Sequence, residues 1–211
     1  MTLVKICGII NQEDALHAAK LGADFVGFLV EIDFAEDKVK REEAKEIIKK
    51  LPLEVQPVFV TYLQKAEPII EIAKETSPQI IQLHNVMELE EIGKIRAALP
   101  KIKITKSIQV ADESAIKKAQ KYENYVDYIL LDTKGKYGRG GTGKTHNWNI
   151  SAKIVKTVKK PVFLAGGLNP DNTEEAIKTV KPFAVDTNSG VKDKARVKNY
   201  EKMKLFIEAA K

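Results

Sequence analysis

The chain has 211 residues, of which 44% are hydrophobic and 30% charged, with 35 basic side chains against 29 acidic ones and a formal net charge of +6. Its length suits one domain spanning residues 1–211, and the absence of an 18-residue apolar run or a signal-like N-terminus predicts a cytoplasmic protein with no membrane partner. Interleaved charges without intervening aromatic residues argue against a nucleic-acid partner, while one cysteine and three dispersed histidines exclude a disulfide framework and a metal site.

Short β-branched runs alternate with amphipathic stretches along the whole chain. The expected strands cover residues 3–7, 24–30, 57–61, 79–84, 102–108, 127–132, 161–166 and 183–188. The expected helices cover residues 11–21, 41–50, 65–76, 87–98, 112–122, 147–159, 171–179 and 195–210. Near-continuous apolar strands are typical of parallel sheets covered on both faces. In the first helix we expect Asn11 to cap the start and Gly22 to end it.

Repeated strand–helix units that end on a helix predict an α/β protein, a single (β/α)8 TIM barrel. An open doubly wound sheet is the alternative, but near-equal units spread over the whole chain favour a closed barrel. In such barrels the functional side chains lie at the carboxyl ends of the strands.

Two reactive side chains end expected strands. Cys7 ends the first and Asp132 ends the sixth. A cysteine there is often a small apolar side chain, and an aspartate often caps a turn. However, Lys5 lies two residues before Cys7 on the same face of the strand and is expected to lower the pKa of the thiol. A base and an acid of different types at one rim suit a proton-shuttling isomerisation better than a hydrolysis.

Residues 138–145, GRGGTGKT, match the P-loop motif of nucleotide triphosphatases. A true P-loop follows its strand directly, whereas TKGKY separates Asp132 from Gly138. The expected barrel also argues against this hypothesis. A glycine-rich loop able to approach an anion remains.

Two further glycine-rich segments, AGGL (165–168) and TNSGV (187–191), end the seventh and eighth expected strands. TIM barrels frequently bind phosphate with the loops after these two strands. Ordinary tight turns are the alternative, but three neighbouring glycine-rich loops favour a phosphate site.

Several stretches in order along the chain resemble the phosphoribosylanthranilate isomerase family. They are VKICGI (4–9), GADFVGF (22–28), VFV (58–60), IQLH (81–84), LLDT (130–133), GGTGKTHNW (140–148), LAGGLNPDN (164–172) and VDTNSGV (185–191). The resemblance implies an isomerase of tryptophan biosynthesis that performs an Amadori rearrangement of a small phosphorylated aminosugar. It implies no cofactor and no metal, and a monomer or homodimer.

The resemblance also implies roles for individual residues. Cys7 would be the general base that takes the proton from sugar C2, and Asp132 the general acid that protonates the ring oxygen. His84 is expected either to line the substrate or to hydrogen-bond a neighbouring loop. The residues expected to hold the phosphate are Gly141, Thr142, Gly143, Gly166, Gly167, Asn188, Ser189 and Gly190, and those expected to line the substrate are Lys5, Lys38, Gln82, His84 and Asp186.

The chain departs from the family pattern after the second strand. Where the family carries Ser-Pro-Arg before a valine, with the arginine meeting the anthranilate carboxylate, this chain has Asp37 at the arginine position and Lys38 beside it. An aspartate repels a carboxylate, and a lysine lacks the two-pronged grip of arginine. Lys38 or another cation is expected to take the carboxylate instead. Two alternatives follow: a paralogue that isomerises another phosphorylated aminosugar, and a non-catalytic phosphosugar-binding barrel.

Overall fold

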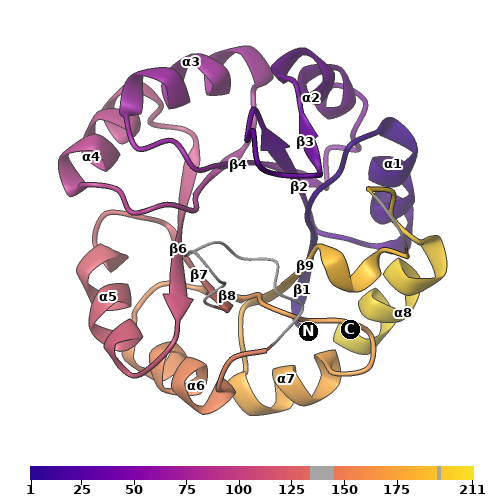
Figure 1. The fold of residues 1–211 in the computed structure, drawn as a ribbon, viewed down its shortest axis with the longest axis vertical. Helices are drawn as coiled ribbons and strands as arrows, with labels where there is room; N and C mark the ends of the chain where they lie inside the picture. The colour runs from indigo at the N-terminus through magenta and orange to yellow at the C-terminus, as the bar shows by residue number, and fades with distance from the viewer. Residues whose placement is uncertain (134–144, 194–195) are drawn as a thin grey trace.

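A closed ring of parallel strands surrounded by helices forms the molecule (Figure 1). The computed structural model describes residues 1–133, 145–193 and 196–211. The ring strands in this part of the chain are β1 (Leu3–Ile6), β2 (Phe25–Val30), β4 (Gln56–Thr61), β5 (Ile80–Leu83), β6 (Lys103–Val110), β7 (Tyr128–Thr133), β8 (Val162–Leu164) and β9 (Ala184–Thr187). The first strand pairs with both β9 and β2, which closes the barrel. The predicted TIM barrel is therefore confirmed, and the open sheet is wrong.

Helices follow the strands around the outside of the ring, so that each strand is covered on its outer face (Figure 1). In the described residues they are α1 (Gln12–Leu21), α2 (Arg41–Ile48), α3 (Ala66–Thr76), α4 (Leu89–Ala98), α5 (Ser114–Glu123), α6 (Trp148–Thr157), α7 (Thr173–Val180) and α8 (Tyr200–Ala210). The amide of Asp14 donates to Asn11 Oδ1 at 2.7 Å, and Gly22 ends α1 with a φ of 96°. Both predicted caps of this helix are confirmed.

The period of two along each strand divides the core into an outer and an inner part. Val4 and Ile6 belong to the large apolar layer between strands and helices. A smaller cluster fills the ring itself, where Phe25 and Phe163 meet edge to face at 5.1 Å. Cys7 also belongs to this inner cluster and lies just beyond the carboxyl end of β1. The interior of the barrel is thus filled by apolar side chains, and it becomes polar toward the carboxyl ends of the strands.

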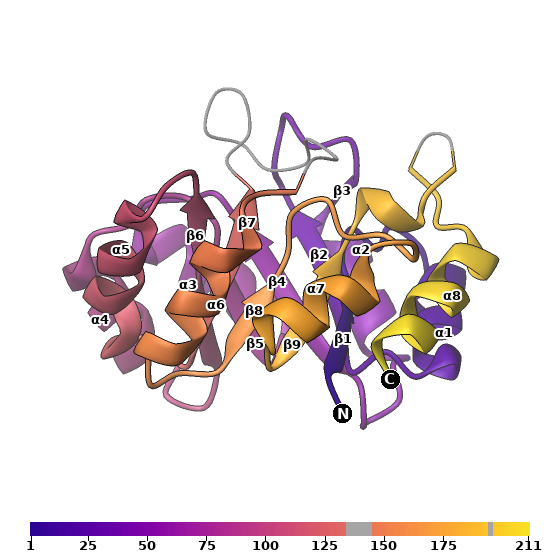
Figure 2. The ribbon, with the colours of Figure 1, turned by 90° about the horizontal axis from the view of Figure 1, so that it is seen from below.

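Two short elements at that end were not expected from the sequence. Strand β3 (Lys38–Val39) pairs parallel with the end of β2, and the 3₁₀ helix η2 (Ser189–Val191) follows β9. The last helix also begins later than expected, at Tyr200, because Asn199 accepts the amide of Lys202 at 2.8 Å and caps it there. In Figure 2, β3 projects at the top, whereas the chain termini lie at the opposite end of the barrel.

None of the helices in the described part of the chain has the length and apolar content that a bilayer crossing requires.

Candidate active site

A cavity of about 450 Å³ opens at the carboxyl ends of the strands. Its volume falls in the range of small-molecule sites. Segments far apart in the sequence contribute to it. The lining residues are Cys7, Leu29, Phe34, Ala35, Glu36, Asp37, Val60, Tyr62, Gln82, His84, Leu130, Asp132, Ala165, Gly166, Gly167, Leu168, Asp186, Thr187, Asn188, Ser189 and Lys192.

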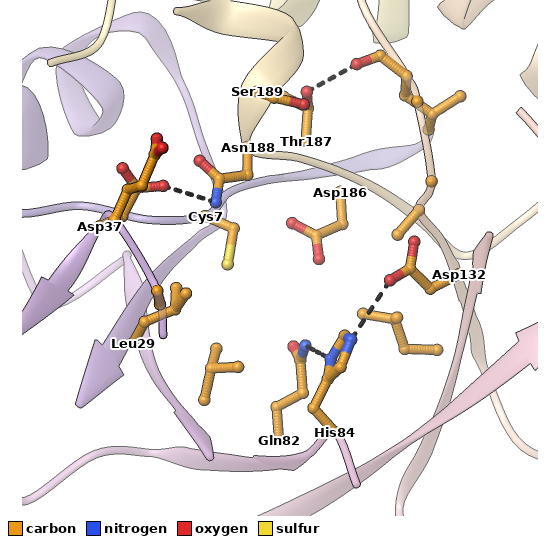
Figure 3. A pocket seen from close by; sticks show the side chains of 18 of the residues that line it. Cys7, Leu29, Asp37, Gln82, His84, Asp132, Asp186, Thr187, Asn188 and Ser189 are labelled. Carbon is orange, nitrogen blue, oxygen red and sulfur yellow. Dashed lines mark hydrogen bonds and ion pairs between the residues drawn. The ribbon is translucent and has the colours of Figure 1, made fainter. Parts of the chain in front are cut away.

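Cys7 and Asp132 lie on opposite sides of this cavity, with Asp186 between them (Figure 3). The amide of Cys7 donates to the carbonyl of Thr187 at 2.8 Å, which fixes the end of β1 against β9. A side chain at Gly27 would place its Cβ 2.7 Å from Cys7 Sγ. Because Gly27 has no Cβ, the Cys7 sulfur can occupy this space.

The pKa of the Cys7 thiol lies above its ordinary value, because burial favours the neutral form. Lys5 and Lys198 act in the opposite direction but do not offset the burial. The expectation that Lys5 gives Cys7 a lowered pKa is therefore wrong in its net direction. The sequence shows the neighbouring cation but not the depth at which the sulfur is buried.

Lys5 lies below the cavity, fully buried in the barrel interior, and is not among the lining residues. Its ammonium donates to Asp186 Oδ2 at 2.8 Å and to Gln82 Oε1 at 2.9 Å. Burial raises the pKa of Asp186 despite this ion pair. Asp186 Oδ1 is buried with no hydrogen-bond partner among the described residues. The lysine thus joins two of the expected lining residues from beneath.

The contacts of Gln82 fix the orientation of His84. Because an ammonium only donates, Gln82 Oε1 faces Lys5 and its amide nitrogen faces His84 Nδ1, at 3.2 Å. Nδ1 therefore accepts, and the proton of a neutral ring resides on Nε2. Nε2 lies 3.3 Å from Asp132 Oδ2, without the alignment of a hydrogen bond (Figure 3). His84 both lines the cavity and contacts its neighbours.

The loops after β8 and β9 lie against each other. Thr187 Oγ1 donates to the carbonyl of Leu168 at 2.8 Å. Gly166 and Gly167 both have positive φ values, 88° and 71°, which disfavour other residues. Together with Asn188 and Ser189 they line the cavity, whereas Gly190 lies just outside it. The amides of two of the three expected phosphate loops are therefore adjacent.

The third expected phosphate loop, with Gly141, Thr142 and Gly143, lies outside the described residues, as does most of the P-loop-like motif. Among the described residues, no group of three or more histidine, cysteine or acidic side chains is arranged to hold a metal ion.

The expected carboxylate partner Lys38 does not reach the cavity. Its side chain is exposed, and Nζ donates to the carbonyl of Asp33 at 2.9 Å. Lys38 and Val39 form β3, where the buried Val39 pairs with Val30 and belongs to the outer apolar layer, while the Lys38 side chain lies in solvent. Asp37 does line the cavity, where it is buried and forms an ion pair with Lys192.

Sequence reasoning missed an apolar wall and one cation. Leu29, Phe34, Val60 and Tyr62 line one side of the cavity, and the rings of Phe34 and Tyr62 meet edge to face at 4.9 Å. Leu29 and Val60 could have been found, because each is the last inward-facing residue before the end of an expected strand. Lys192 could not, because its loop carried no recognised motif.

The family model for N-(5'phosphoribosyl)anthranilate (PRA) isomerase matches residues 4–209. The N-(5'-phosphoribosyl)anthranilate isomerase of Methanocella arvoryzae is 38% identical over 208 residues, which cover 99% of this chain and 97% of that protein.

Solved structures give the same result. The crystal structure of phosphoribosyl anthranilate isomerase from Thermotoga maritima matches with a TM-score of 0.90 and 37% identity, covering 100% of this chain and 98% of that one. A crystal structure of the isomerase in complex with reduced 1-(o-carboxyphenylamino)-1-deoxyribulose 5-phosphate matches with a TM-score of 0.87 and 34% identity, with the same coverage.

Proposed function

The chain belongs to the N-(5'-phosphoribosyl)anthranilate isomerase family, and we propose that Cys7 and Asp132 carry the proton transfers of its reaction. The enzyme isomerises N-(5'-phosphoribosyl)anthranilate to 1-(2-carboxyphenylamino)-1-deoxyribulose 5-phosphate, an aldose–ketose conversion in tryptophan biosynthesis. The observation that supports the residue roles is the placement of a thiol and a carboxyl on opposite sides of one cavity.

The reaction begins with opening of the sugar ring. Asp132, in its protonated form, gives its proton to the ring oxygen as the bond between that oxygen and C1 breaks. The lone pair of the anilino nitrogen forms a double bond to C1, which yields an iminium ion. General acid catalysis of this kind contributes roughly 10²- to 10⁴-fold to a rate. His84 Nε2 lies 3.3 Å from Oδ2 of this carboxyl.

The second proton transfer uses the opposite side of the cavity. The Cys7 thiolate takes the proton from C2, the C–H electrons form a C1–C2 double bond, and the iminium electrons return to nitrogen. The resulting enolamine loses the proton of its 2-hydroxyl group and gains one at C1, which gives the aminoketose. No atom is lost or gained, so the chemistry needs two proton-transfer groups and no oxidant.

The remaining walls fit the two ends of this substrate. The adjacent amides of Gly166, Gly167 and Ser189 suit the 5'-phosphate, because backbone N–H groups in glycine-rich turns bind anions. The apolar wall that contains Phe34 and Tyr62 suits the aromatic ring.

The fluorescence of anthranilate-type substrates provides a continuous assay. We expect Cys7→Ala and Asp132→Asn each to lower kcat/KM by about 10²-fold or more with the circular dichroism spectrum unchanged. Asp33→Asn, an equally conservative change at an exposed rim position, serves as the matched control and should retain the parent activity. If both variants retained the turnover rate of the parent, other groups would have to move the protons.

A further inference from the structure

The charges that line the cavity do not match the charges of the substrate. The substrate carries a phosphate at one end and a carboxylate on its aromatic ring, both negative. The acidic lining residues are Glu36, Asp37, Asp132 and Asp186, whereas Lys192 is the one lysine or arginine among the described lining residues. Burying an anion without a positive or hydrogen-bonding partner is strongly unfavourable. The position of Lys192 therefore bears directly on how the substrate is held.

A chain of buried contacts holds Lys192 at the cavity. Its ammonium forms an ion pair with Asp37 Oδ2, with the two side chains 12% and 5% exposed. Asn188 Nδ2 donates to the same oxygen at 2.9 Å, and Lys198 Nζ donates to Asn188 Oδ1 at 2.6 Å. Lys198 thus holds Asn188, Asn188 holds Asp37, and Asp37 holds the ammonium of Lys192 in place without a ligand.

Lys192 retains capacity for a second anion. An ammonium has three donors, and Asp37 is the only described residue that accepts from this one. Asp37 belongs to the segment between β2 and β3 that also supplies Phe34, so the ion pair joins the ammonium of Lys192 to the segment that carries part of the apolar wall. Among the described lining lysines and arginines, Lys192 is therefore the cation available to a carboxylate on a ring that binds this wall.

We propose that Lys192 binds the carboxylate of the substrate's aromatic ring and that Asp37 is the positioning residue that holds it there. The inference rests on the proposed function and names the specificity determinant of the same site. The cation comes from the loop after β9, not from the loop after β2 where Asp37 and Lys38 stand. An acidic residue in the latter loop is then compatible with an acidic substrate, because it orders the lysine that receives the carboxylate.

Two product analogues separate this role from general binding. One is reduced 1-(o-carboxyphenylamino)-1-deoxyribulose 5-phosphate, and the other is the same compound without the carboxyl group. By calorimetry we expect Lys192→Met to weaken binding of the first by about ten- to a hundredfold and to change binding of the second by less than about twofold. Lys192→Arg, which retains the charge, should restore most of the preference for the carboxyl group. Lys178→Met, on the exposed face of α7, is the matched control and should bind both analogues as the parent does.

Three results would overturn the inference. In the first, Lys192→Met leaves the affinities for both analogues unchanged. In the second, Lys192→Met weakens both affinities equally, which would assign the lysine to the phosphate. In the third, Lys38→Met abolishes the preference for the analogue with the carboxyl group. If Lys192→Met does not fold, Lys192→Gln is measured in its place, with the same expected loss of preference. A parent enzyme that does not turn over phosphoribosylanthranilate would count against the proposed function itself. If the parent turns it over but Lys192→Met retains the preference for the carboxyl group, only the role of Lys192 is contradicted.

Discussion

Cys7 is buried near two lysines, and the balance of these effects decides its state. Removal from water favours the neutral thiol, while the charges of Lys5 and Lys198 favour the thiolate. Burial prevails and raises the pKa of the thiol above 9.0. The free enzyme at neutral pH therefore holds most of Cys7 as the thiol, and only the minor thiolate form is competent as a base.

This balance predicts the pH dependence of the reactivity of Cys7. Because the thiolate is the nucleophile and its fraction grows as pH rises through a raised pKa, the rate of Cys7 alkylation by iodoacetamide should increase with pH up to and beyond about pH 9. An alkylation rate that levels off below pH 7 would contradict the raised pKa.

The close contact between the loops after β8 and β9 requires that residue 190 has no Cβ atom. A Cβ at Gly190 would lie 2.0 Å from the backbone carbonyl oxygen of Leu168, so the two loops could not remain in contact. Neither loop can yield without breaking the hydrogen bond from Thr187 to Leu168. The close approach of these loops brings the expected phosphate amides together.

Gly190→Ala is expected to lower the free energy of unfolding by about 1–3 kcal/mol and to weaken binding of inorganic phosphate. Gly93→Ala is the matched control, because Gly93 is exposed within α4 and a Cβ there meets nothing within 4 Å. That change should stabilise the protein by up to about 1 kcal/mol. Urea unfolding measures both effects, and equal stability of the two variants would contradict the argument.

His146 lies between β7 and α6, two residues before the start of the helix. Its Nδ1 lies 3.0 Å from Thr133 Oγ1 and its Nε2 lies 2.6 Å from Ser151 Oγ. The amide of Thr133 donates in turn to Asp132 Oδ1 at 2.8 Å. Burial lowers the pKa of His146 to about 4, so the ring is neutral at pH 7. The histidine thereby steadies the residue that follows Asp132.

The lowered pKa of His146 predicts a loss of stability in acid. Between its ordinary pKa of 6.5 and about 4 the unfolded chain binds a proton that the folded chain does not, so the free energy of unfolding decreases as pH falls through this window. His146→Gln removes that titration and should show a shallower decrease from pH 6.5 to 4. Urea unfolding at several pH values measures the difference, and parallel curves for the two proteins would refute the shift.

At the scale of the whole molecule, Lys5 connects strands that lie far apart around the ring. It extends from β1 to Asp186 on the adjacent β9 and to Gln82 on β5, which is not a neighbour of β1. The ammonium is fully buried, and its charge is balanced by Asp186. Removing one partner leaves the other charge unpaired in the interior.

Lys5→Met is therefore expected to lower the free energy of unfolding by about 3–5 kcal/mol. The double change Lys5→Met with Asp186→Leu removes both charges and should recover much of that loss. Lys178→Met, which breaks only an exposed pair on α7, should cost less than about 1 kcal/mol. A double variant as unstable as Lys5→Met alone would show that packing, not the unpaired charge, causes the loss.

The barrel could be predicted from the sequence, because the order of strands and helices and the inward parity at strand ends are local properties of the chain. Cys7 and Asp132, which their positions at strand ends indicated, and Gln82 and Asp186, which the family resemblance implied, line one cavity. Alternation along a strand fixes the face of a side chain before any tertiary contact forms.

The electrostatics of the site could not be predicted from the sequence, because they depend on contacts that form on folding. The pKa of Cys7 depends on how deeply the sulfur is buried, and no neighbouring residue in the sequence reports that depth. Lys192 and Asp37 are 155 positions apart, and they meet only because the closed ring brings the loops after β9 and β2 together. Lys38 stands beside Asp37 in the sequence yet points to solvent. Electrostatic partners are set by distance in space, which the chain acquires on folding.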